Sequence, residues 1–166
     1  MRTLRFPLLA LVAAAALAAS PAAGGSLAGV SLPDRAEAGG QTLVLNGMGL
    51  RKKLFIKVYV GGLYLPSKES SASKVLAADV PRRMVMHFLY DVSKEQMCDA
   101  WNEGLEANTP SAGADVKSAF GTLCGWMEDL PKGNRLVMTY VPGEGTRVEV
   151  NGKGEKDKGD KAKGPH

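Results

Sequence analysis

The chain has 166 residues, of which 45% are hydrophobic, 21 are Lys or Arg and 17 are Asp or Glu. A chain of this length and composition is expected to build one hydrophobic core, so we predict a single globular domain with short appendages. The net charge of +4 does not indicate a nucleic-acid partner. Its excess lies in a predicted leader, with Arg2 and Arg5, and in the last segment, with five Lys and three acids, so the body of the domain is nearly neutral.

The first twenty residues have the pattern of a secretory signal peptide. Arg2 and Arg5 precede an apolar run over 6–19 that is too short to span a bilayer. The small residues that a signal peptidase needs end at Ala18 or Ser20. We therefore expect residues 1–20 to be removed and the protein to be periplasmic or secreted, without a membrane span after cleavage. A retained N-terminal helix buried in the domain is the alternative.

Residues 21–40 are rich in Ala, Gly, Ser and Pro without a period, which predicts a linker and an irregular lead-in. From Gln41 onward, alternation of apolar and polar residues predicts strands. Lys52 and Lys53 form the expected turn between the first two strands, and a short helix is expected over 67–78. The five expected strands cover residues 42–51, 54–65, 82–90, 134–141 and 146–150.

Two longer helices are expected between the third strand and the closing hairpin. Ser93 and Gln96 have the spacing of a capping box, which begins a helix that should reach about Ala107. The loop over 108–113, with Pro110 inside it, separates this helix from the next. Each helix carries one apolar stripe, which predicts an antiparallel pair packed on a sheet. The stripes are Met97, Trp101 and Leu105 on the first helix, and Val116, Phe120, Leu123, Cys124 and Met127 on the second.

The two cysteines lie at equal distances from residue 111, the middle of the loop between these helices. In an antiparallel pair, Cys98 and Cys124 would therefore stand at the same height. A disulfide is expected in an oxidising compartment, with two buried free thiols as the alternative. Neither His87 nor His166 has ligand-like spacing to a cysteine, so we expect no metal site and no cofactor.

Signatures of catalysis are nearly absent from the sequence. It contains neither the nucleophile motif Gly-x-Ser-x-Gly nor a glycine-rich phosphate loop. His87 is the only histidine expected inside the domain, and on a strand it is more often a satisfied residue than a base. We therefore predict no catalytic residue.

Three segments carry a resemblance to a known family. "LNGMGLR" (45–51), "FIKVYVGGLYL" (55–65) and "SKEQMCDAWNEGL" (93–105) resemble the chalcone isomerase-like family, in particular its short secreted bacterial members. The resemblance implies an α+β domain over 41–151, an open-faced β-sandwich in which helices cover one side of an antiparallel sheet and a ligand lies between them.

The end of the chain departs from this family pattern. Family members continue into another helix after the segment that matches "VEVNGK". Here the Lys- and Gly-rich residues 152–166 are expected to be disordered, so the C-terminal helix would be missing. The sheet face left uncovered would favour self-association.

The resemblance also implies a ligand site. In the plant enzyme, the arginine matched by Arg51 contacts the flavanone. In plastid fatty-acid-binding relatives, that arginine and a tyrosine matched by Tyr59 hold a carboxylate. A guanidinium offers two parallel donors and a phenol a third, while Met97 and Trp101, with Met84 and Phe88, would line an apolar space for the rest of the ligand.

We therefore expect an exported, non-catalytic protein that binds a small amphipathic acid, either a fatty acid or an aromatic carboxylate. Two other functions stay open. One is a chalcone–flavanone type isomerase, an intramolecular lyase in which Arg51 stabilises the phenolate. The other is a structural or interaction protein, in which residues 51–53 are only a solvated turn.

Overall fold

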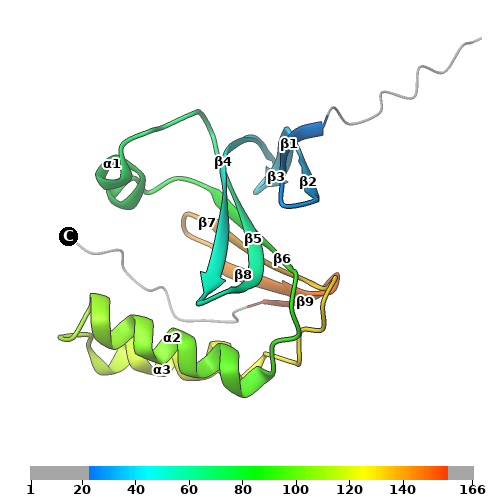
Figure 1. Cartoon of the computed structure of the whole chain (residues 1–166). Coiled ribbons are helices and arrows are strands. Elements are labelled where there is room, and N and C mark those ends of the chain that lie inside the picture. Colours follow the sequence, from blue (N-terminus) through cyan, green and yellow to red (C-terminus); the bar gives the residue numbers. More distant parts are fainter. Residues whose placement is uncertain (1–22, 157–166) are drawn as a thin grey trace, which may run out of the picture.

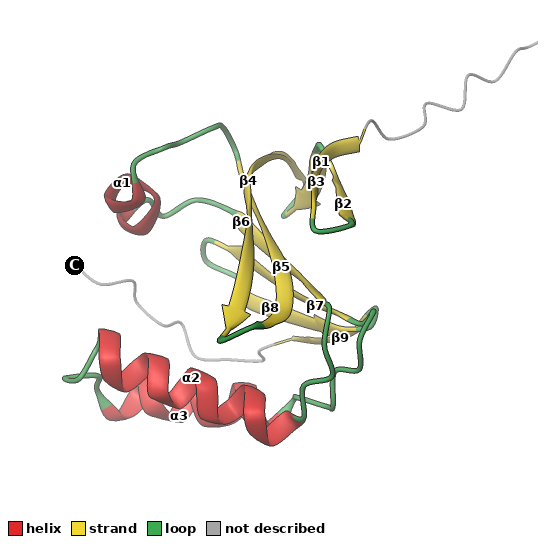
Figure 2. Cartoon of the chain, viewed as in Figure 1, coloured by secondary structure: helices red, strands yellow, loops and turns green. Residues whose placement is uncertain are grey.

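The computed structural model describes residues 23–156, which form a curled antiparallel sheet with a helix pair on one face and a small hairpin on the other (Figures 1 and 2). The seven strands of the main sheet pair in chain order, from β3 to β9. Their bounds are β3 Arg35–Ala38, β4 Gln41–Lys53, β5 Ile56–Leu65, β6 Arg82–Phe88, β7 Arg135–Val141, β8 Gly145–Val150 and β9 Lys153–Lys156. The remaining elements are β1 Ala23–Leu27, β2 Val30–Pro33, α1 Ala72–Ala77, α2 Lys94–Asn108 and α3 Ala114–Gly125.

The segment expected to be a linker, 21–40, instead contributes β1, β2 and β3 within its described part. The β1–β2 hairpin packs on the main sheet, where Val30 and Leu32 are buried. The Tyr64 hydroxyl on β5 donates a hydrogen bond of 3.0 Å to the Pro33 carbonyl, which holds the end of this hairpin to the sheet. The prediction of a linker was wrong because its small residues show no alternation, although they form three short strands that pairing and tertiary packing stabilise.

The turn of the β4–β5 hairpin also differs from the prediction. Lys52 pairs with Lys57 and Lys53 pairs with Ile56, so both lysines belong to β4. The turn is formed by the next two residues, Leu54 and Phe55. The ladder therefore extends beyond the point where the alternation of apolar residues ends, because backbone pairing does not require apolar side chains.

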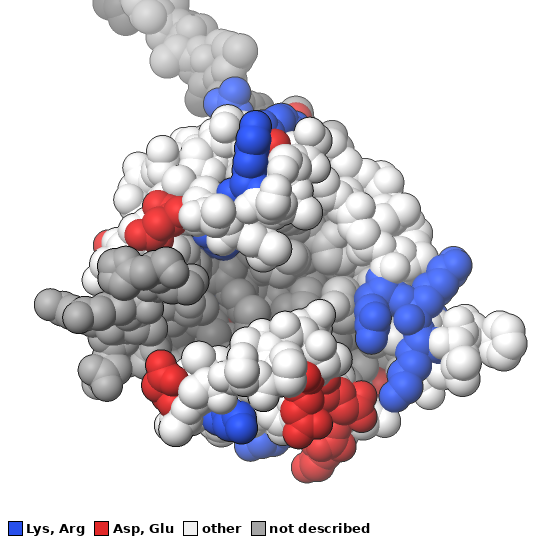
Figure 3. Space-filling view, turned by 90° about the vertical axis from the view of Figure 1, so that its left-hand side faces the viewer, with Lys and Arg blue, Asp and Glu red and all other residues white. Residues whose placement is uncertain are grey.

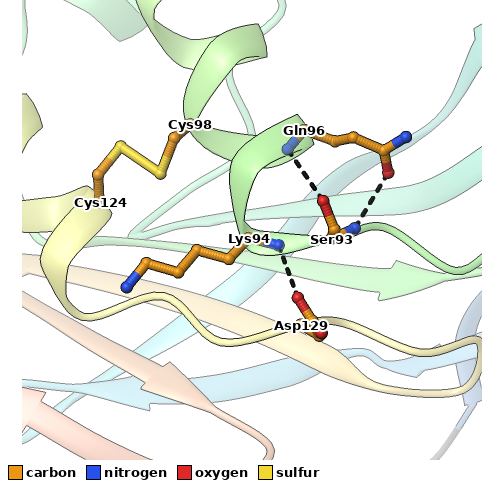
Figure 4. Close-up of a disulfide and its surroundings, with 6 residues drawn as sticks. All are labelled: Ser93, Lys94, Gln96, Cys98, Cys124 and Asp129. Atoms are coloured by element: carbon orange, nitrogen blue, oxygen red, sulfur yellow. Dashed lines mark hydrogen bonds between the residues drawn. A yellow bond between two sulfur atoms is a disulfide. The ribbon is translucent and has the colours of Figure 1, made fainter.

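The helix pair begins as the capping box predicts. The backbone N–H of Gln96 donates to the Ser93 side chain at 3.2 Å, and the backbone N–H of Ser93 donates to Gln96 Oε1 at 3.0 Å (Figure 4). The backbone N–H of Lys94 donates to Asp129 Oδ1 at 2.9 Å, which ties the start of α2 to the chain that follows α3.

A disulfide joins α2 to α3. Cys98 and Cys124 face each other across the pair, with a Cα–Cα distance of 5.5 Å (Figure 4). This distance is typical of disulfides, and the arrangement is the one expected from their equal distances to the loop.

The two faces of the sheet support separate apolar cores. The core under the β1–β2 hairpin consists of Val30, Leu32, Ala38, Leu43, Leu45, Val60, Tyr64 and Val85. The core on the helix side consists of Met86, Phe88, Met97, Met127, Leu130, Leu136, Val148 and Val150, with Tyr59, Met84 and Trp101 packed against it. Successive strand residues alternate between these cores, as Tyr59 and Val60 do, because side chains of a strand point to opposite faces.

The predicted tail, 152–166, begins with a strand rather than with irregular chain. In β9, Lys153 pairs with Val150 and Lys156 pairs with Arg147. Within residues 23–156 no helix follows β8. The rest of the predicted tail and the predicted signal peptide lie outside the described residues. None of the helices in the described part of the chain is long and apolar enough to cross a membrane.

Candidate functional site

The register of β4 and β5 places Arg51 directly opposite Tyr59. Residues that lie opposite each other in an antiparallel pair point to the same face of the sheet. Tyr59 packs against the core on the helix side, so Arg51 leaves the sheet on that face as well. The structure thus brings together the two residues expected to bind a carboxylate, although eight residues separate them in the sequence.

The two side chains differ in their surroundings. Tyr59 is half-buried, and its ring lies 5.6 Å from that of Phe88, with an angle of 56° between the planes. Arg51 is exposed near the end of β4. Among the described residues, Arg51 has no ion pair and the Tyr59 hydroxyl has no hydrogen-bond partner. The packed ring gives the phenol a defined position, whereas the guanidinium can adapt to a ligand.

A strip of glycines runs along the same face and ends at Arg51. Gly47 pairs with Leu63 and Gly49 pairs with Gly61, in the register that brings Arg51 opposite Tyr59. Among the described residues, a Cβ atom on Gly47 or Gly49 would meet no atom within 4 Å, and one on Gly61 would meet its nearest at 3.6 Å. We call Gly47, Gly49 and Gly61 the glycine strip. It leaves open space on this face of the sheet beside the two candidate ligand-binding residues.

Helix α2 brings the other predicted residues to this face. Met97 is buried and Trp101 is half-buried, and both belong to the core on the helix side. Farther along the pair, Leu105 and Phe120 are only half-buried, and Val116 is 38% exposed. The described residues therefore leave part of the apolar stripe uncovered. Figure 3 shows a hollow between the helix layer and the sheet.

Charge is unevenly distributed around this hollow. Lys and Arg side chains gather at its right-hand edge in Figure 3, whereas Asp and Glu side chains lie on the helix layer below. The β4–β5 hairpin contributes Arg51, Lys52, Lys53 and Lys57 within seven residues, all of them exposed. The exposed acids of α2 are Glu95, Asp99, Glu103 and Glu106. An anionic group would therefore be attracted toward the hairpin and repelled by the helix.

Two further hollows lie outside this candidate site. The larger, of about 410 Å³, is lined by Arg83, Gly133, Arg135, Val137, Glu149, Asn151 and Gly152. Its cations already have partners, since Arg83 lies 3.6 Å from Glu149 and Arg135 donates to His87 Nδ1 at 3.3 Å. Burial, helped by the Arg135 charge, lowers the pKa of His87 below its ordinary value. The smaller, of about 190 Å³, is also lined by Arg83 and Glu149. Neither hollow contains Arg51, Tyr59, Met97 or Trp101.

The glycine strip is a feature that the interpretation of the sequence missed. Its signal was present, because Gly47, Gly49 and Arg51 are spaced by two and must share one face of a regular strand. That spacing predicts a surface without side chains leading to a guanidinium.

The antiparallel sheet is covered by helices on one face, so the fold is the predicted α+β open-faced sandwich. The family model described as "Chalcone isomerase-like" matches residues 24–162. The chain belongs to the chalcone isomerase-like family.

A solved structure supports this fold assignment. A fatty-acid-binding protein of Arabidopsis thaliana superposes with a TM-score of 0.60 and 20% sequence identity, over 78% of this chain and 79% of that chain. At this identity the likeness concerns the fold alone. No curated protein matches the chain in sequence.

Proposed function

We propose that this protein binds a small amphipathic acid, without catalysing a reaction, in the space between the sheet and the helix pair. The carboxylate would lie between Arg51 and Tyr59, and the apolar part would extend over the glycine strip toward Trp101. The observation that carries this proposal is the pairing of Arg51 with Tyr59 beside the glycine strip. The similar Arabidopsis protein is itself described as a fatty-acid-binding protein, which supports the same class of ligand.

The chemistry of the two side chains suits an acid better than an alcohol. A guanidinium stays charged at any physiological pH and donates two parallel hydrogen bonds to a carboxylate, and the Tyr59 hydroxyl adds a third donor. An alcohol offers no charge to the guanidinium. Fatty acids and aromatic carboxylates both present a carboxylate to these donors. Titration with acids that differ in chain length and ring content distinguishes the two classes.

The contacts and positions of Gln96, Tyr90 and His87 favour binding over isomerisation. Gln96 already accepts the backbone N–H of Ser93 in the capping box. Tyr90 is 49% exposed beyond the end of β6. His87 is paired with Val60, whose side chain belongs to the opposite core. Apart from the Tyr59 hydroxyl, which the proposal assigns to the carboxylate, these polar groups are engaged in the helix cap, exposed beyond β6 or paired with a residue of the opposite core.

Replacing Arg51 by Ala is expected to weaken acid binding about thirtyfold, because it removes a charge-assisted pair worth about 2 kcal/mol. Arg51→Lys should recover only part of the loss, since the two-donor geometry is absent. Calorimetric titration with a fatty acid and with the alcohol of equal chain length measures both effects.

Lys52→Ala is the matched control, because it removes one charge from the same hairpin without altering the residue opposite Tyr59. It should change acid affinity only slightly, and no variant should change alcohol binding. Equal acid affinity for wild type and Arg51→Ala would refute the proposed acid site.

We also propose that the protein is exported. The support is the Arg-flanked apolar run in residues 1–20, which the family match beginning at residue 24 does not include. Protein recovered from the periplasm or medium of its host is expected to begin near residue 19 or 21, as measured by intact mass and N-terminal sequencing. Recovery of exported protein with Met1 intact would contradict cleavage, and protein found only in the cytoplasm would contradict export.

A further inference from the structure

We propose that the tip of the β4–β5 hairpin docks onto an anionic phospholipid bilayer. The hairpin tip, residues 51–57, carries three large apolar side chains in a row. Leu54 is 86% exposed, Phe55 98% and Ile56 43%. Single exposed apolar residues are ordinary on protein surfaces, but a contiguous group at the end of a projecting hairpin is typical of an interaction site.

Basic residues flank this apolar group on both sides. Arg51, Lys52 and Lys53 precede it and Lys57 follows it, and no acid interrupts residues 51–57. None of these four cations forms an ion pair with a described residue. Their charges are therefore available to a partner, and they surround the apolar side chains in the way that headgroups surround the apolar layer of a membrane.

The backbone conformation at Leu54 disfavours leucine, which indicates that the apolar side chain itself has a role at the tip. Leu54 has a φ angle of +52°, in the left-handed region that Gly and Asn adopt more easily than bulky residues. A hairpin selected only to reverse the chain would favour Gly or Asn at this position. The strained Leu54 instead places an apolar side chain in water next to Phe55.

Among the partners that a basic and apolar tip could fit, a lipid surface satisfies both chemistries at once. Phosphate headgroups would pair with the lysines while Leu54 and Phe55 enter the interface below them. A nucleic acid would take the charges but leave two large apolar side chains in water. A second copy of the same tip would bring four cations against four others, which electrostatic repulsion opposes.

This proposal does not depend on the proposed acid site, although the two are adjacent through Arg51. The test therefore leaves Arg51 unchanged, so that failure of one proposal can be distinguished from failure of the other. Lipid docking is measured by flotation with phosphatidylcholine vesicles that contain or lack phosphatidylglycerol. All proteins compared share the same N-terminal and C-terminal residues.

The wild type is expected to float with vesicles that contain phosphatidylglycerol and to bind those that lack it far more weakly. Lys52→Gln with Lys53→Gln should lower the partition coefficient about thirtyfold, because each basic residue near an anionic surface raises it by a factor of about five. Leu54→Asn with Phe55→Ser should lower it at least about tenfold, because the apolar contribution is lost. The melting temperature of this second variant should stay equal or rise, since Asn adopts the left-handed conformation at position 54 more easily than Leu does.

Two control variants carry matched changes elsewhere on the surface. Lys117→Gln with Lys132→Gln removes the same charge from exposed positions outside the hairpin, and Leu76→Ser removes a leucine that is 79% exposed on α1. Both should bind vesicles as the wild type does.

Three results would overturn the proposal. The first is that the tip variants float as well as the wild type. The second is that the controls lose binding as strongly as the tip variants. The third is that the wild type binds no vesicles of either kind. This includes the case in which light scattering shows that the wild type self-associates and that the variant with Phe55→Ser does not.

Discussion

Gly49→Val is expected to weaken acid binding by about a hundredfold while leaving the protein folded. A Cβ at Gly49 would meet no atom of residues 23–156 within 4 Å, so the valine would occupy space on the helix-side face and not displace the core. That space is where the proposed ligand lies, and filling it imposes an overpacking penalty on the complex alone. Valine also favours strands over glycine, so the free energy of unfolding should stay equal or rise by up to about 1 kcal/mol. Calorimetric titration and thermal unfolding measure the two effects.

Gly62→Val provides the contrasting control on the same hairpin, at the residue that follows Gly61 of the glycine strip. Gly62 faces the other core, where an added Cβ would clash with a methyl group of Leu32. This variant should lose about 1–3 kcal/mol of stability through overpacking under the β1–β2 hairpin. The protein that remains folded should bind acid as the wild type does. Wild-type affinity in Gly49→Val would show that the ligand does not cross the glycine strip.

Removing the disulfide is expected to have the largest effect on stability. Cys98 and Cys124 close a loop with a sequence separation of 26, for which the chain-entropy model predicts about 3.5 kcal/mol. Cys98→Ala with Cys124→Ala should therefore lower the melting temperature by about 10 °C. Differential scanning calorimetry of the variant and the wild type measures this loss.

A reductant serves as the control for the disulfide. It should lower the melting temperature of the wild type to that of the double variant, and should leave the double variant unchanged. If both thiols of protein taken from its own host react with an alkylating agent after denaturation without reduction, the bond does not form in the cell.

The local elements of the fold were predictable where short-range interactions decide them. Ser93 and Gln96 satisfy each other's backbone groups within one helical turn, so the start of α2 could be predicted from their spacing alone. The equal heights of Cys98 and Cys124 followed from the loop between two antiparallel helices. The strands from β4 to β8 followed from alternation, with errors at their ends.

The candidate site was predictable only in part. The family resemblance pointed to Arg51 and Tyr59, but they lie opposite each other only because the β4–β5 ladder skips Val58 between the Arg51–Tyr59 and Lys52–Lys57 pairs. A second irregularity, which sets the register of the other end of the ladder, lies at Asn46, whose side chain exchanges hydrogen bonds of 3.0 and 2.8 Å with the backbone of Glu69, 23 residues away. A register set by such a distant contact cannot be derived from periodicity.

The sequence by itself determined the residue types, the capping box, the alternation of the longer strands and the spacing of the cysteines, because these depend on neighbours within a few positions. Only the tertiary structure decided that β1 and β2 pack on the sheet, that β4 continues through Lys53, and that Arg51 faces Tyr59 beside the glycine strip. Such features depend on contacts between distant segments, whose combined burial and hydrogen bonding outweigh local preference. The turn at Leu54 and Phe55 illustrates this, since the ladder of β4 with β5 places a leucine at a φ angle of +52° that its own preference disfavours.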